Sequence, residues 1–378
     1  MKTYLDRIIL LVLLQNFVYS KTYYYIGDRP HVFVKFSAND TELKTADLEI
    51  ETFETFFIGL ECAKVYNCTT QKTPESKAYD GSKYPASPTG KTPDISFGVA
   101  TLHTTEYRGY LGSALIEADD KALFNVVESS SKNFFISHSG IIGLNVDPNN
   151  PESQAIRLFK SLKENKQIIV GRGPFYQTVR DKQMNSNLHG HIALDEAKLS
   201  GCGDFTYMPT EGSGWQVKAS VKVGDKTYAN QVVGFSFHEA TQAPSKIFQE
   251  HFNSVTDPDK LPDLTLIHSG HEFAVNRSNF ENYYGNEMLI VHADVNENGQ
   301  FLLGENFLSN WCIALKADND LKKFEIGLAP MTPLKDDPKW TKLGDNGNDG
   351  GGKGDEASAA VLSFRLIVAA IFGTKLLC

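Results

Sequence analysis

The sequence lacks the signatures of several common classes of binding site. It contains neither Cys-x-x-Cys nor His-Glu-x-x-His, and it has no glycine-rich loop of the kind that cradles phosphate groups. There is no stripe of lysine and arginine, and the net charge of −9 is far from that of a nucleic-acid-binding protein. Two histidine pairs, His189/His191 and His268/His271, have no supporting ligand context. We therefore expect no metal, no cofactor and no nucleic-acid partner.

The first 20 residues are typical of a secretory signal peptide. Lys2 and Arg7 give a positive start, Ile8–Leu14 is the apolar run, and Val18-Tyr19-Ser20 is a small-residue cleavage site. This pattern predicts export through the secretory pathway to the cell surface or the extracellular space, with residues 1–20 removed.

The end of the sequence predicts a membrane anchor. After Pro330 an acidic, glycine-rich linker over 333–350 leads to a polar spacer and the apolar tail Val361–Cys378. Small residues, a spacer and a terminal apolar segment are typical of a GPI-anchor signal, here 351–378, with Gly350 as the candidate attachment residue. A transmembrane helix is the alternative, but the tail is short for one. A plain hydrophobic tail is another.

Runs rich in β-branched and aromatic residues, separated by glycine, asparagine, aspartate and proline, predict a mostly β chain. They include Gln167–Val170, Trp215–Val223 and Met288–His292. Hydrophobic residues make up 41% of the chain, which is enough for one or two packed cores. The alternation Asp47-Leu48-Glu49-Ile50-Glu51 predicts a strand whose three acids lie on an exposed face.

Two helices are expected. One covers Asn149–Asn165, with Asn149 or Asn150 as its cap and a stripe of buried apolar residues. The other begins at Pro244. The stripe residues of the two helices are Ala155, Ile156, Leu158, Phe159 and Leu162, and Ile247, Phe248 and Phe252. Both stripes favour a core position over a binding surface.

Several short segments between about Tyr25 and Pro330 carry a resemblance that no single one would support. They are Ser139–Leu144, Gly190–Leu194, Gly203–Pro209, Gly214–Val217, Leu303–Leu308 and Trp311–Pro330. In this order they resemble the pepsin-like aspartic peptidase family, the peptidase A1 domain. The resemblance implies an all-β, bilobal acid-protease fold with two β-barrel lobes, a central cleft and a joining sheet. The lobes would cover 21–210 and 211–332.

The sequence departs from this family at the catalytic positions. Each lobe of an active member supplies one aspartate from Asp-Thr-Gly or Asp-Ser-Gly, and the two carboxyls share a proton. Neither tripeptide occurs in this chain. The first-lobe position falls at Glu49, or at Asp47 after a shift, and Gly234 takes the place of the second aspartate. The resemblance therefore implies an inactive homologue.

The flap of the family is also altered. Gly109-Tyr110-Leu111-Gly112 resembles its returning strand. The expected turn over Leu102–Arg108 has no glycine, and Leu102 occupies the position of the flap tyrosine.

Cysteine usage suits an oxidising compartment, because loss of Cys378 with the tail leaves an even number. The resemblance implies a Cys62–Cys68 disulfide in the first lobe. Cys202 and Cys312 are not typical of the family, but the resemblance puts their strands in the joining sheet. We expect them to form a second disulfide, with two buried free thiols as the alternative.

Three hypotheses about function follow. The first is a pseudo-peptidase, a surface-anchored or secreted protein that binds a peptide or protein in its cleft. The second is an active endopeptidase with a non-standard pair, such as Glu49 with another acid. The third is a structural or antigenic surface glycoprotein, since sequons at Asn39, Asn67 and Asn276 predict N-linked glycans. The sequence does not determine the oligomeric state.

Overall fold

The computed structural model describes residues 22–26, 30–40, 42–64, 68, 75–84, 86–98, 100–113, 115, 119–134, 136, 138–147, 149–172, 189–212, 214–253, 255, 261–274, 292–293, 299–308 and 310–331. The described part is mostly β, in agreement with the all-β prediction. None of its helices has the length and apolar character needed to span a membrane. The predicted signal peptide, linker and anchor signal lie outside the described residues.

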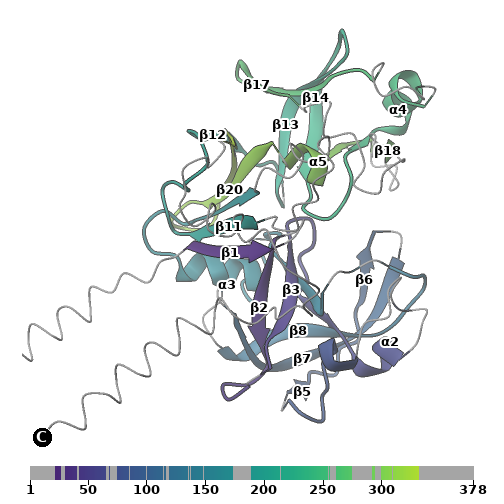
Figure 1. The fold of residues 1–378 in the computed structure, drawn as a ribbon, viewed down its shortest axis with the longest axis vertical. Coiled ribbons are helices and arrows are strands. Elements are labelled where there is room, and N and C mark those ends of the chain that lie inside the picture. The colour runs from purple at the N-terminus through teal and green to yellow at the C-terminus, as the bar shows by residue number, and fades with distance from the viewer. Residues whose placement is uncertain are drawn as a thin grey trace, which may run out of the picture. The chain divides into compact units, whose positions relative to one another are not determined.

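The first sheet is built from N-terminal strands and closes on itself. β2 pairs with β7 as well as with β3, so the order returns to its start, and closure leaves fewer exposed strand edges. β7 and β8 run side by side as a long antiparallel ribbon (Figure 1). In spatial order the strands are β2 (His31–Lys35), β3 (Lys44–Glu49), β9 (Gly140–Gly143), β4 (Phe56–Ile58), β8 (Asp119–Ser130), β7 (Ala100–Ser113) and β5 (Ser87–Pro88), with β6 (Asp94–Phe97) also on β7.

The second sheet comes from the C-terminal part of the chain. Its centre is the antiparallel ribbon β13–β14, in which alternate residues of β13 are buried, as a half-covered sheet requires. The order is β17 (His271–Ala274), β16 (Leu264–His268), β13 (Gln216–Val223), β14 (Lys226–Phe235), β19 (Phe301–Leu303), β15 (Gln242–Ala243) and β18 (His292–Ala293).

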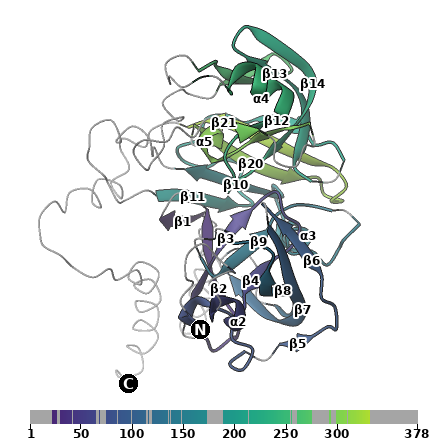
Figure 2. The ribbon, with the colours of Figure 1, turned by 90° about the vertical axis from the view of Figure 1, so that its right-hand side faces the viewer.

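A third sheet combines strands from both parts of the sequence (Figure 2). Its order is β1 (Thr22–Ile26), β11 (His189–Leu194), β10 (Gln167–Arg172), β20 (Trp311–Ala317), β21 (Phe324–Pro330) and β12 (Thr206–Pro209). A disulfide joins Cys202 to Cys312 of β20, and another joins Cys62 to Cys68, so both predicted pairings are confirmed.

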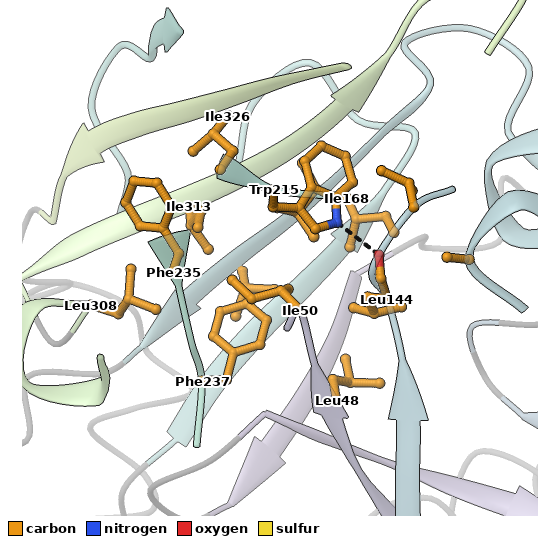
Figure 3. Close-up of a cluster of buried hydrophobic side chains, with 14 of the residues drawn as sticks. Leu48, Ile50, Leu144, Ile168, Trp215, Phe235, Phe237, Leu308, Ile313 and Ile326 are labelled. Atoms are coloured by element: carbon orange, nitrogen blue, oxygen red, sulfur yellow. Dashed lines mark hydrogen bonds between the residues drawn. The ribbon is translucent and has the colours of Figure 1, made fainter. Parts of the chain in front are cut away.

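One hydrophobic core connects the three sheets. Figure 3 shows side chains from each of them in a single cluster, including Leu48 of β3, Phe235 of β14 and Ile313 of β20. The indole of Trp215 satisfies its polar atom within this core by donating to the carbonyl oxygen of Leu144 at 2.7 Å.

Both predicted helices are present, the first of them shorter than predicted, and the second has Pro244 as its N-cap. The described helices are α2 (Leu60–Lys64), the 3₁₀ turn η1 (Glu75–Lys77), α3 (Gln154–Ser161), α4 (Ser245–His251) and α5 (Glu305–Leu308). The apolar stripe of α3 is buried as predicted, whereas Phe248 on α4 is only partly buried.

The predicted limits of the first helix are wrong at both ends. Asn149 does not cap it, because its side chain and backbone amide bond to Asp147, and Ser153 is the N-cap. At the other end the carboxylate of Asp195 accepts the backbone amides of 163–166, so these amides are unavailable to continue a helix.

Candidate functional site

Two pairs of short parallel strands repeat the same arrangement. In the first strand pair, β3–β9, Glu49 lies beside Gly143, and the amide of Leu144 donates to the Glu49 carbonyl oxygen at 2.7 Å. In the second strand pair, β14–β19, Phe235 lies beside Leu303, and the amide of Ser236 donates to the Leu303 carbonyl oxygen at 3.1 Å. Continued by one residue, this register puts Ser236 beside Gly304.

The two glycines serve the same purpose in the two pairs. A Cβ atom on Gly143 would meet the backbone oxygens of Thr52 and Glu54, and one on Gly304 would overlap the backbone of the segment from Glu239 to Thr241. In each pair the crowding backbone begins three residues after the facing residue, Glu49 or Ser236. The chain therefore repeats one arrangement: a strand, then a loop whose backbone passes directly over a glycine of the paired strand. In this arrangement Ser236 is the counterpart of Glu49.

Glu49 and Ser236 meet at the point where the two strand pairs face each other. The hydroxyl of Ser236 lies 3.4 Å from both carboxyl oxygens of Glu49 and donates to them. Glu49 Oε1 also accepts the amides of Ile50, Glu51 and Phe237 at 2.7, 3.1 and 3.3 Å. Ser236 Oγ accepts the amides that follow it, from His238 and Glu239. The site thus holds one buried carboxyl opposite one buried hydroxyl.

The two nearby carboxyl groups are both hard to ionise. Burial, reinforced by the charge of Glu51, raises the pKa of Glu49 to about 8 against the opposing effect of its backbone hydrogen bonds. Loss of surrounding water raises the pKa of Glu51 to about 7, although its side chain is exposed at the surface. The nearby Ser236 hydroxyl opposes this increase, and the charge of Glu239 adds to it. At neutral pH Glu49 is therefore mostly protonated.

The burial of these acids corrects the strand prediction. Asp47 and Glu49 are 1% and 2% exposed, and only Glu51 faces solvent. The prediction of three exposed acids is wrong because other parts of the chain cover this face of β3: His138 contacts Asp47, and Ser236 of the second strand pair contacts Glu49.

The hairpin β6–β7 reaches this site from the first sheet. The ring of Phe97, at the end of β6, lies 5.2 Å from that of His238, and a Cβ atom on Gly98 would lie 3.3 Å from Glu239 Oε1. Gly98 has a φ of +55°, which favours glycine at this turn. The hairpin end therefore lies against the loop that follows Ser236.

The turn predicted over Leu102–Arg108 is not found there. Leu102–Arg108 forms no turn but lies within the continuous strand β7, and Leu102 is fully buried opposite Ile95. The chain reverses after Phe97, where Gly98 supplies the glycine that the predicted turn lacked.

Of the other predicted site residues, Gly234 lies within β14, paired with Gln216 and Leu302, so that Ser236 and not Gly234 faces Glu49. Asn39 is exposed. Asn67, Asn276 and Gly350 lie outside the described residues, as does the side chain of His189. His268 and His271 are register partners across β16–β17.

A second cluster joins His31, Asp47 and His138. Their ligand atoms all lie within 4.8 Å of one another. The Nδ1 atom of His138 lies 2.5 Å from Asp47 Oδ1, and the two imidazole rings are 4.4 Å apart. No spacing in the sequence marks this group, because its members come together only through strand pairing.

Comparison of the chain with family models gives no match, and comparison with curated proteins gives none either.

Proposed function

We propose that this protein is a secreted or surface-anchored homologue of the aspartic peptidases, proteolytically inactive, that binds an extended peptide or protein segment beside Glu49 and Ser236. The two strand pairs would belong to the two lobes of a pepsin-like fold, and the sheet that combines β1, β10 and β11 with β20 and β21 would join them. The hairpin β6–β7 would be the flap, with Phe97 as its aromatic residue.

The contact between Glu49 and Ser236 carries the proposal. Aspartic peptidases need two carboxyls that share a proton, one of which activates the attacking water. Here the residue in the counterpart position is a serine, whose hydroxyl does not ionise near neutral pH and already accepts two backbone amides. The arrangement of strand pair and facing glycine occurs twice, but only one of the two facing residues, Glu49, is an acid.

The solvent-facing groups around this contact suit a polar, extended ligand. Glu51 is exposed, and His238 and Glu239 are partly exposed. Among the described strands β6 pairs only with β7, so its other edge can form backbone hydrogen bonds with an added strand. An extended peptide laid along this edge would run past Phe97 toward Glu239.

The test is binding and cleavage of one set of probes, an array of unstructured ten-residue peptides of varied sequence. The purified mature protein should retain a subset of the peptides and cleave none. Glu51→Gln should reduce retention at least about tenfold, a loss of about 1.4 kcal/mol. The matched control outside the site is Glu272→Gln, an exposed glutamate on β17, which should bind as the wild type does.

Two outcomes would contradict the proposal. Cleavage that pepstatin blocks and Glu49→Gln abolishes would establish the competing function, an active endopeptidase with a non-standard acid pair. Absence of any retained peptide would favour a structural or antigenic surface protein.

A further inference from the structure

The cluster of His31, Asp47 and His138 has the composition of a transition-metal site. Two imidazoles and one carboxylate are a ligand set that suits zinc, whereas calcium and magnesium prefer oxygen ligands alone. The three residues come from β2, β3 and the segment before β9. Their ligand atoms all lie within 4.8 Å of one another, and small side-chain rotations would bring them to the separation of about 3.3 Å between ligands of a tetrahedral zinc ion.

Backbone pairing fixes each of the three residues in place. His31 and Asp47 are register partners in the antiparallel pair β2–β3. The segment that carries His138 is held beside β3, because the amide of Ser139 donates to the carbonyl oxygen of Thr45 at 2.8 Å. Such anchoring holds the ligands together before any ion binds, which reduces the entropy lost on binding.

Asp47 gives an independent indication of a missing ligand. Its side chain is 1% exposed, and Oδ2 has no hydrogen-bond partner among the described residues. A buried carboxylate oxygen without a partner is costly and unusual in folded proteins. Oδ1 contacts His138, so one carboxylate oxygen is satisfied and the other is not. A bound cation would supply the absent interaction.

We propose that His31, Asp47 and His138 bind one divalent transition-metal ion, with Zn²⁺ as the best fit, and leave its fourth position open to water or to a donor atom of a ligand. The ion takes the place of the proton on His138 Nδ1 and binds the Asp47 carboxylate, in which the otherwise unpartnered Oδ2 becomes a ligand atom. This proton is released to solvent, and His138 Nδ1 and Asp47 Oδ1 move apart from 2.5 Å. His138 is 23% exposed, which gives the ion a path from solvent. The site is independent of the proposed peptidase ancestry.

Another histidine–aspartate pair of the same sheet provides a matched control. His103 Nδ1 lies 2.8 Å from Asp94 Oδ1 across β6–β7, but both side chains are exposed and the pair is not part of the three-residue ligand cluster. Two ligands in water hold zinc much more weakly than three held together. Loss of His103 should therefore leave zinc binding unchanged.

The experiment is calorimetric titration of the metal-free mature protein with ZnCl₂ and, separately, visible spectroscopy with Co²⁺ as the probe. The wild type and His103→Gln should bind one equivalent of zinc with the same affinity and give the absorption of tetrahedral cobalt. His31→Gln should lose at least about tenfold in affinity and lose that absorption. His31→Gln leaves the buried contact between His138 and Asp47 in place. It therefore tests the site with less risk to folding than a substitution of Asp47 would carry.

Thermal unfolding gives a second readout, because an ion that binds only the folded chain raises the midpoint. Zinc should raise the midpoint of the wild type and of His103→Gln but not of His31→Gln. Two results would overturn the proposal: equal zinc affinity in His31→Gln and the wild type, or no more zinc binding than a control protein that lacks a metal site.

Discussion

The two strand pairs share a backbone design but differ in the chemistry of the residue they present. β3–β9 presents Glu49 and β14–β19 presents Ser236, each beside a glycine that admits a crossing segment. Glu49 has a carboxyl group whose pKa depends on its surroundings, whereas Ser236 has a hydroxyl group that does not ionise between acidic and neutral pH. The architecture therefore depends on the glycines and the strand register, and it does not require a carboxyl on both sides.

Substitution of Gly143 or Gly304 should have the largest effect on stability, because these glycines are what the two strand pairs have in common. Gly304→Ala and Gly143→Ala would each force a methyl group into backbone atoms, and we expect each to lower the free energy of unfolding by about 3 kcal/mol or more. Urea denaturation measures the loss. Gly81→Ala, whose methyl group would have only Tyr79 within 4 Å at 3.7 Å, should change stability by less than about 1 kcal/mol. If both Gly143→Ala and Gly304→Ala changed stability only slightly, the two glycines would not be the basis of the repeated arrangement.

The pH dependence of stability should separate the two pairs, because only the first titrates. The pKa of Glu49 is about 8 in the folded protein and about 4.5 when unfolded, so the folded state binds more protons between these values. The contribution of Glu49 to stability should therefore be fully present below the lower value and be lost as pH rises through this window, by up to about 1.4 kcal/mol per pH unit.

Glu51 acts in the same direction, and Glu239 adds its charge. Urea midpoints at a series of pH values should give a flatter profile for Glu49→Gln than for the wild type, while Ser236→Ala keeps the slope. A wild-type profile that rises through this range would contradict the assignment.

Removal of the hydroxyl tests the second pair. Ser236→Ala leaves the amides of His238 and Glu239 without this buried acceptor and deprives Glu49 of a donor, so we expect a loss of about 1–3 kcal/mol in urea denaturation. Ser131 provides the comparison, because its hydroxyl also accepts a backbone amide but lies in an exposed position. Ser131→Ala should cost less than Ser236→Ala, and the reverse order would show that the Ser236 contacts add little.

Local patterns in the sequence were enough to predict much of the fold. The β-rich runs, the apolar stripe of α3 and the glycines near Ile142 and Leu303 are visible without a structure. The Cys202–Cys312 disulfide followed from the expectation that both strands belong to one sheet.

The site was harder to predict because strand pairing between distant residues defines it. Glu49 and Ser236 are 187 residues apart in sequence, and His138 and Asp47 are 91 apart. The alternation around Glu49 suggested an exposed face, but alternation does not reveal that a second strand pair covers that face. Alignment by motif alone selected Gly234, two residues before the residue that the strand register brings to Glu49.

The decisive measurement is proteolysis of a denatured protein substrate by the purified mature protein, from strongly acidic to neutral pH, with and without pepstatin. Because a single buried carboxyl faces Ser236, the protein should yield no pepstatin-sensitive fragment at any pH, and Glu49→Gln should be indistinguishable from the wild type. Fragments that appear at acidic pH and disappear with pepstatin or with Glu49→Gln would show that the site holds a working acid pair.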